Sequence, residues 1–362
     1  MNVVKATRQF EQWLGRRTDL VKPDLRFKHK NMKAEVFPFL RATYYRWAQI
    51  WPKVDPDLAK APHILAVGDL HVENFGTWRD IDGRLIWGVN DFDEAFPMSY
   101  VNDLMRLAVS AHLAAEARHL QLEHKDICDA ILEGYRTAMQ EGGRPFVLEE
   151  THTWLRQIAE SELRDPVHFW AKMDALKPLK NDDVPISAIE AIEHLMPVRN
   201  LKYSVAHRVA GLGSLGHARY VGLAEWMGGK IAREAKALVS SACYWAADHD
   251  GPSEILYQAI INRAVRCPDP FVQLRGRWIV RRLSPHCSRI ELADLKAQGQ
   301  ELRLLEAMGW ETANIHLGTR SARKAILRHL SKQKGKWLHK ATLAMAEAVR
   351  EDWKDWKKDG YN

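Results

Sequence analysis

The chain has 362 residues, a formal net charge of +7, 46% hydrophobic residues and 27% charged residues. This composition is typical of a globular chain that buries a core, and it excludes a mainly disordered protein. The basic balance suits a polyanionic ligand such as a nucleotide. Lys and Arg are spread widely and no nucleic-acid-binding motif appears, so nucleic acid is not an expected partner.

The four cysteines are isolated from one another, without a CxxC pair, which favours a reducing compartment over a disulfide framework. The first fifteen residues lack an apolar signal core, and no run of the sequence approaches the roughly 18 apolar residues of a membrane span. We therefore expect a cytoplasmic protein with no membrane partner.

Residues 1–34 are polar and basic, and we interpret them as an arm that docks on the rest of the chain. A helix is predicted to begin after Pro38, with apolar residues on one face. Arg41 lies in this helix and is a candidate phosphate contact, although an arginine on a helix surface is equally consistent with simple solvation.

Acidic and amide side chains gather after a short apolar run, residues 64–67, which predicts a buried strand. Asp69 follows this strand directly, and Asn74 comes five residues later. A predicted hairpin then returns the chain to a second acidic segment with Asp91 and Asp93. The sequence thus offers two acidic loops joined by one hairpin.

Carboxylate and amide oxygens are the ligands that Mg²⁺ prefers, and the spacing from Asp69 to Asn74 to Asp91 is the one that kinases use. Asp69 would be the catalytic base, Asn74 and Asp91 the metal ligands, and Asp93 a second carboxylate. With His71 between Asp69 and Asn74, the segment resembles the GDxHxxN catalytic loop of aminoglycoside and choline kinases. The alternative is that these residues cap turns and form a solvated acidic loop.

A glycine-rich segment, residues 211–216, stands between two predicted strands, and its candidate phosphate-binding residues are Gly211, Gly213, Ser214 and Gly216. Glycines there would let backbone N–H groups approach phosphates. GxGxxG also occurs in dinucleotide folds, but there the glycines open a helix, whereas a strand-like RYVGL follows here. A glycine-rich hairpin without a ligand is the remaining alternative.

The next predicted strand offers Lys230, Arg233 and Lys236, where a kinase carries the lysine that pairs with nucleotide phosphates. We favour Arg233 as the phosphate contact, because an arginine can bind phosphate bidentately, although it does not replace a lysine atom for atom. A solvated basic strand is the alternative.

The order of these motifs predicts the architecture. The glycine-rich segment follows the acidic loops, which reverses the order found in kinases and predicts a circularly permuted, two-lobed α+β fold with a helical catalytic lobe and a small antiparallel-sheet lobe. The expected division is residues 1–200 for the arm and catalytic lobe, 201–295 for the nucleotide-covering lobe, and 296–362 for helices that return to the catalytic lobe.

The segments GDLHVENFG, VNDFDEAFP, VNDLMRLAVS, GLGSLGHARYVGL, REA and RWIVRRL, in this order, resemble the bacterial family called domain of unknown function 2252, which is itself similar to aminoglycoside phosphotransferases and kinases. The resemblance spans roughly residues 28–350 and implies a kinase-like fold with a nucleotide and metal site. The sequence departs from the family at residues 233–235, Arg-Glu-Ala, where the family has Lys-Glu-Ala.

The leading hypothesis is an ATP- and Mg²⁺-dependent transferase that moves a phosphoryl group to a hydroxyl of an unknown acceptor, either a small molecule or a protein. Nucleotidyl transfer by the same residues stays open. Two other classes remain: a nucleotide-binding, pseudokinase-type module, suggested by the apparent lack of the strand lysine, and a metal-dependent phosphoesterase, suggested by the Asp and His of GDLHVEN.

Overall fold

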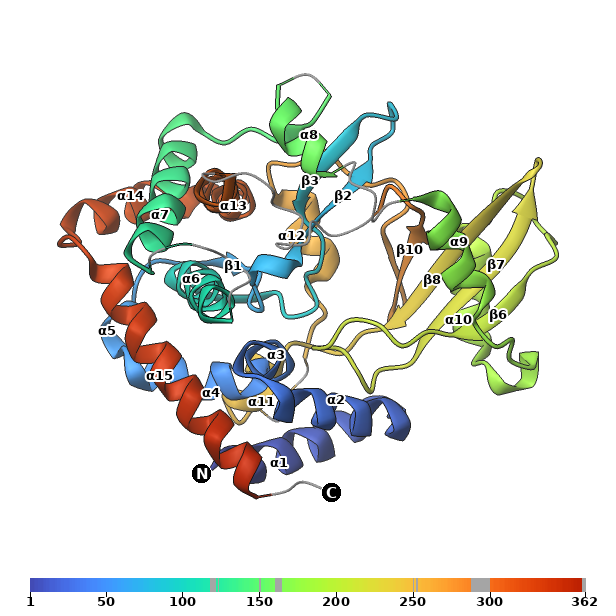
Figure 1. Cartoon of the computed structure of the whole chain (residues 1–362), viewed down its shortest axis with the longest axis horizontal. Coiled ribbons are helices and arrows are strands. Elements are labelled where there is room, and N and C mark those ends of the chain that lie inside the picture. The colour runs from blue at the N-terminus through green and yellow to red at the C-terminus, as the bar shows by residue number, and fades with distance from the viewer. Residues whose placement is uncertain are drawn as a thin grey trace.

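The computed structural model describes residues 1–117, 122, 124–149, 151–159, 165–249, 251, 253–287 and 300–359. It is a mixed α+β structure in which helices surround two small sheets on one side, while a larger antiparallel sheet stands on the other side (Figure 1). Among the described residues, no helix is both long enough and apolar enough to cross a membrane.

The N-terminal helices form one side of the larger, helical part of the chain. Helix α1 is amphipathic and is capped by the side chain of Asn2, which accepts a hydrogen bond from the backbone N–H of Lys5 at 3.0 Å. Proline in the first turn of α2 and α5 fits the helix start, where no N–H partner is needed. The bounds are α1 (Val3–Gly15), α2 (Lys22–Ala34), α3 (Val36–Ala42), α4 (Tyr44–Val54) and α5 (Pro56–Ala59).

Two small antiparallel sheets follow and carry the acidic loops at their ends. One pairs β1 with β4, and the other has the order β2, β3, β5. The predicted strand and hairpin are therefore present, and both faces of β3 are buried. The bounds are β1 (His63–Ala66), β2 (Phe75–Arg79), β3 (Leu85–Val89), β4 (Phe96–Ser99) and β5 (Phe146–Val147).

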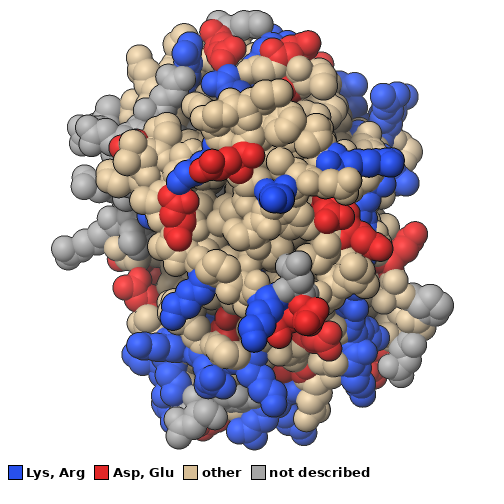
Figure 2. Space-filling model, turned by 90° about the vertical axis from the view of Figure 1, so that its right-hand side faces the viewer, with Lys and Arg blue, Asp and Glu red and all other residues tan. Residues whose placement is uncertain are grey.

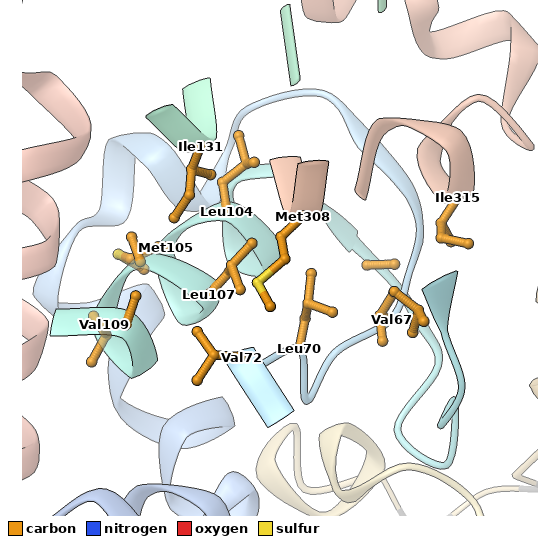
Figure 3. Packing of buried hydrophobic residues seen from close by; sticks show 14 of the residues in the cluster. Val67, Leu70, Val72, Leu104, Met105, Leu107, Val109, Ile131, Met308 and Ile315 are labelled. Carbon is orange, nitrogen blue, oxygen red and sulfur yellow. The ribbon is translucent and has the colours of Figure 1, made fainter. Parts of the chain in front are cut away.

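Helix α6 runs through the centre of the main core. Its apolar side chains pack against those of the Asp69 loop, α7 and α13 (Figure 3). Helices α7 and α13 approach so closely that a Cβ at Gly134 would lie 1.9 Å from the carbonyl oxygen of Glu306. The bounds are α6 (Val101–Glu116), α7 (His124–Glu141), α8 (Thr153–Ala159), α13 (Gln300–His316), α14 (Arg323–Lys332) and α15 (Trp337–Lys358).

The larger sheet is antiparallel with the order β6, β7, β8, β10, β9. Helices α9 and α10 pack on it through two small apolar clusters, although they precede residue 201, where the sequence-based division places the start of that lobe. Helices α11 and α12 instead join the main core. The bounds are α9 (Pro166–Asp174), α10 (Ile186–His194), β6 (Ser204–His207), β7 (Arg219–Trp226), β8 (Gly229–Ala237), α11 (Ala242–Ala246), α12 (Tyr257–Arg263), β9 (Gln273–Arg275) and β10 (Trp278–Leu283).

The close crossing of α7 and α13 gives the first prediction. Gly134→Ala adds about 1 kcal/mol of helix propensity but places a methyl group against the backbone of α13, and overpacking of this kind costs more than the propensity returns. We expect a net loss of about 1–3 kcal/mol in the free energy of unfolding, measured by urea denaturation.

Gly15→Ala in α1 is the matched control, because a Cβ there meets only the side chain of Leu20, at 3.4 Å or more. It should leave stability unchanged or raise it slightly. Equal effects of the two substitutions would show that helix propensity, and not the crossing, sets the outcome.

Candidate functional site

A cavity of about 740 Å³ lies between the helical part and the larger sheet. This volume is in the range of small-molecule and cofactor sites. The described residues from the two acidic loops, the glycine-rich segment and β10 contribute to its lining. On the molecular face that bears the larger sheet, basic and acidic side chains alternate, with Lys and Arg denser toward its lower edge (Figure 2).

Asp69 is oriented by a fully buried arginine on α6. Arg106 Nε donates to Asp69 Oδ1 at 2.7 Å, and Arg106 Nη2 donates to the carbonyl of Leu40 at 2.9 Å. The guanidinium carbon lies 5.0 and 4.9 Å from the ring centroids of Tyr44 and Trp47. Burial raises the pKa of Asp69 and the charge of Arg106 opposes that rise. The carboxylate is thus held in one orientation.

The backbone that leads into Asp69 is held by the first turn of α6. The N–H groups of Val67 and Gly68 donate to the carboxylate of Asp103 at 2.7 and 3.0 Å, and Asn102 Nδ2 donates to the carbonyl of Gly68 at 3.0 Å. The imidazole of His316 bonds to the same carboxylate at 2.9 Å. Asn102 and Asp103 are residue types that typically cap a helix, but in the structure they hold the backbone that leads into the Asp69 loop.

Asn74 joins the two acidic loops. Its Nδ2 donates to the carbonyl oxygens of Asp69 and Asp91, each at 3.1 Å. Since the amide nitrogen is used in this way, the side-chain oxygen is the atom that a cation would take. The five-residue offset from Asp69 therefore places the amide beside the second acidic loop, as the sequence predicts.

Lys236 on β8 reaches across the cavity to the second acidic loop. Its Nζ lies 3.3 and 3.4 Å from the carboxylate oxygens of Asp91 and 2.5 Å from Asp93 Oδ2. Burial, and then the charge of Asp91, raise the pKa of Asp93. Burial alone would also raise the pKa of Asp91, but the charge of Lys236, the hydrogen bond with Asp93 and the charges of Arg281 and Arg219 together lower it. Asp93 Oδ1 is buried and has no hydrogen-bond partner among the described residues.

Arg233 lies on the opposite face of β8, which corrects the expectation that it faces the ligand. Its Nε donates to the carbonyl of Leu195 at 2.8 Å, and its guanidinium stacks 4.8 Å from the ring centroid of Phe271. It is not among the residues that line the cavity. Side chains alternate along a strand, so Lys236, three residues further, points the other way. Of the two basic residues, Lys236 is therefore the one that contacts the acidic loop.

Glu234 shares the cavity face of β8 and binds three arginines. Its fully buried carboxylate accepts hydrogen bonds from Arg208, Arg219 and Arg281 at 2.6, 2.9 and 2.8 Å. Arg219 also donates to Ser214 Oγ at 2.8 Å, which ties the glycine-rich segment to the sheet. The carboxylate of Glu234 thus holds three arginines in place on the sheet. Through Arg219 it also positions the glycine-rich turn.

The glycine-rich segment and the Asp69 loop face the same cavity. Gly211, Gly213 and Ser214 line it, and Gly211 has a φ of +74°, which favours glycine. A Cβ at Gly213 would lie 3.1 Å from the carbonyl of Arg41 and 3.5 Å from Asp69 Oδ2. Two motifs that are far apart in the sequence therefore meet at one place.

Gly216 has a different environment from the other glycines of the segment. It does not line the cavity, and a Cβ there would lie 2.4 Å from the side chain of Leu25 on α2. Its carbonyl accepts from the N–H of Val21 at 2.8 Å, and Lys28 Nζ donates to the carbonyl of Gly213 at 2.9 Å. The expectation that Gly216 contacts phosphate is corrected, because this glycine permits packing against α2.

Two further predicted residues, Arg41 and His71, line the cavity. Arg41 Nη1 forms an ion pair with Glu73 Oε2 at 2.6 Å, so its charge is compensated locally. Of the residues proposed from sequence, all except Gly216 and Arg233 thus line the cavity. Lys236, Glu234 and Arg106 do not line it themselves, but each binds side chains that do.

The structure defines a mixed α+β protein with an acidic and amide cluster facing a glycine turn and a buried lysine across one cavity. Residues 20–172, less than half of the chain, match the family model described as "Uncharacterized protein conserved in bacteria (DUF2252)", so this part of the chain is similar to that family. No curated protein and no solved structure matches the chain significantly.

The buried carboxylate of Glu234 gives the second prediction. Glu234→Gln removes the charge that compensates three arginines, and breaking a buried ion pair of this kind costs about 3–5 kcal/mol in the free energy of unfolding. Glu225→Gln, at an exposed position on the adjacent strand β7, is the control and should change stability by less than about 0.5 kcal/mol.

The same network has a pH dependence with a defined sign. Burial alone would raise the pKa of Glu234, but the three arginines hold it well below the ordinary value of 4.5. Because the folded pKa is the lower one, the contribution is complete at neutral pH and is lost as pH falls from 4.5 through the folded value. The free energies of unfolding of the wild type and Glu234→Gln should therefore converge as the pH falls. A difference between them that stays constant with pH would contradict the assignment.

Proposed function

We propose that this chain is an ATP- and Mg²⁺-dependent, kinase-like transferase that moves a phosphoryl group to a hydroxyl of an acceptor not yet identified. The observation that carries the proposal is the approach of Lys236 to Asp91 and Asp93. A strand lysine facing an aspartate pair, beside a glycine turn, is the constellation that positions nucleotide phosphates and metal ions in kinases.

The residues at the cavity fit the groups that the proposal requires. Asn74 and Asp91 offer an amide and a carboxylate oxygen, and Asp93 Oδ1 is buried without a hydrogen-bond partner among the described residues, as expected of an atom with an absent cationic ligand. Bound Mg²⁺ would neutralise phosphate charge. Lys236 would turn from the carboxylates to the phosphates, and Gly211 and its neighbours in the turn would cover them.

Asp69 suits the role of base. Arg106 holds Oδ1, and Oδ2 lies on the side of Gly213, toward the glycine turn. A carboxylate fixed in this way can accept the proton of an acceptor hydroxyl placed against the terminal phosphate. The same residues would also serve nucleotidyl transfer if the nucleotide were bound in the reverse sense, and the identity of the transferred group separates the two reactions.

A circularly permuted, two-lobed arrangement accounts for the order of these parts. The glycine turn joins β6 to β7 and the lysine lies on β8, which is the third strand as in kinases. The acidic loops precede them in the sequence, and α15 returns to pack against α1, α2 and α3. Helix α15 lies beside α1 (Figure 1), so the first and last helices of the described chain are neighbours, which is the geometry that permutation requires.

The hypothesis of a non-catalytic nucleotide-binding module was motivated by the apparent absence of a strand lysine. Lys236 is a strand lysine that contacts the second acidic loop, and this supports the catalytic proposal over the binding module. A catalytic reaction is therefore the better-supported proposal, and binding without turnover remains the outcome that would restore the alternative.

Lys236→Met gives the third prediction. The wild type incubated with Mg²⁺ and ATP labelled on the γ-phosphate should transfer label to an acceptor in a fractionated extract or to itself. Lys236→Met should lower this rate by at least about 100-fold, because the cation that positions the phosphates is lost. A parallel reaction with label on the α-phosphate reports nucleotidyl transfer instead.

Lys230→Met is the matched control, since Lys230 lies on the same strand, is partly exposed and pairs with Asp174 at 2.5 Å, away from the cavity. It should keep the wild-type rate. Equal rates in wild type and Lys236→Met, or release of phosphate from phosphoesters without any label transfer, would contradict the proposal.

Asp69→Asn gives the fourth prediction. The substitution preserves shape and the site for bound nucleotide but removes the proton acceptor, so turnover should fall by about 10²–10⁴-fold while the Kd for Mg²⁺-ATP changes little. Asp91→Asn should instead act mainly on binding and weaken the affinity for Mg²⁺-ATP. Calorimetric titration of both variants tests this separation, and loss of nucleotide binding in Asp69→Asn alone would assign it a binding role.

A further inference from the structure

A second group of ligand-type side chains lies at the end of α6 and the start of α7, outside the residues that line the cavity. His112 and Glu116 are four residues apart and share one face of α6, and His124 opens α7. The two imidazole rings lie with centroids 3.8 Å apart. One ligand atom from each of the three residues falls within 4.8 Å of the others.

The separation of two of these atoms already suits chelation. His112 Nε2 and Glu116 Oε1 are 3.3 Å apart. Ligand atoms bound at about 2.0–2.1 Å in a tetrahedral site are separated by about 3.3 Å, so these two need no rearrangement. A modest rotation of His124 would bring the third atom to the same distance.

Both histidines carry a nitrogen that the fold does not use. His112 Nδ1 and His124 Nδ1 are buried and have no hydrogen-bond partner among the described residues. Buried polar atoms are nearly always paired in folded proteins, so the unused His124 Nδ1 points to an absent ligand, whereas His112 would bind through Nε2, the atom close to Glu116.

Arg350 on α15 binds two of these three side chains. Its Nη2 donates to His112 Nε2 at 3.0 Å and to Glu116 Oε1 at 2.5 Å, while its Nη1 donates to Glu347 at 3.1 Å. The guanidinium therefore competes with any cation for the same atoms. Its bond to Glu347 gives it an alternative position at the surface.

We propose that His112, Glu116 and His124 bind one transition-metal ion of the Zn²⁺ class. Two imidazoles and a carboxylate select such an ion over Mg²⁺, which prefers oxygen ligands and octahedral geometry. The site is independent of the proposed kinase-like function. Because the ligands come from two helices, the bound ion links the end of α6 to the start of α7, and binding to the folded chain alone stabilises it.

The test is a titration of the full, metal-free chain with Zn²⁺ in competition with a chromophoric chelator, in buffer containing excess Mg²⁺. The wild type should bind one equivalent. Glu116→Ala and His124→Gln should each weaken binding at least tenfold, whereas Glu133→Ala, at an exposed carboxylate on α7, should bind as the wild type does. Glu116 is exposed, so its removal should leave the fold intact.

Arg350→Met supplies a result that a nonspecific surface site would not give. Removing the competing guanidinium should tighten Zn²⁺ binding at least threefold, and the metal-dependent rise in Tm should grow accordingly. Absence of Zn²⁺ binding by the wild type, equal binding by Glu116→Ala and the wild type, or competition by Mg²⁺ would each overturn the proposal.

Discussion

The contact of Lys236 with Asp91 and Asp93 is the interaction on which the arrangement of the cavity depends. It joins side chains 145 and 143 residues apart in the sequence and brings the larger sheet against the acidic loops. An ammonium between two carboxylates offsets their mutual repulsion in a buried place, where unpaired charges are costly. Without it, neither carboxylate would keep an ion pair with the sheet among the described residues, and Arg281 and Arg219 would act on Asp91 only at longer range.

Helix α6 plays the complementary part on the other side of the cavity. Its first turn binds the backbone before Asp69 through Asp103, and one turn later Arg106 binds the side chain of Asp69. The apolar side chains of the same helix pack at the centre of the main core (Figure 3). The loop is therefore fixed by a helix that is buried along nearly its whole length, as preorganised sites require.

Sequence alone predicted the part of the site that depends on local spacing. The strand before Asp69, the offset to Asn74 and the hairpin leading to Asp91 are short-range features, and the structure brings these residues to one cavity. The choice between Arg233 and Lys236 was not predictable in this way, because the inward face of β8 is set by pairing with β7 and β10. The strand sequence GKIAREAKA carries basic residues on both faces.

The role of α6 was also hidden in the sequence. Asn102, Asp103 and Arg106 have the composition of an ordinary capped helix start, and only the fold reveals that their partners lie more than thirty residues away. The same holds for Gly216, whose place in a GxGxxG pattern gives no sign that it packs against α2. Long-range partners decide such roles, and a single sequence does not contain them.

The attachment of the glycine turn to α2 has a consequence for how the cavity exchanges its contents. The turn is bonded to the sheet on one side through Ser214 and to the N-terminal arm on the other through Val21 and Lys28. A ligand that has to pass beneath the turn can do so only if α2 shifts with it or releases it. The turn cannot move away from the acidic loops without breaking its bonds to Val21 and Lys28, so a substitution in α2 can alter the width of the cavity although α2 carries none of the acidic residues.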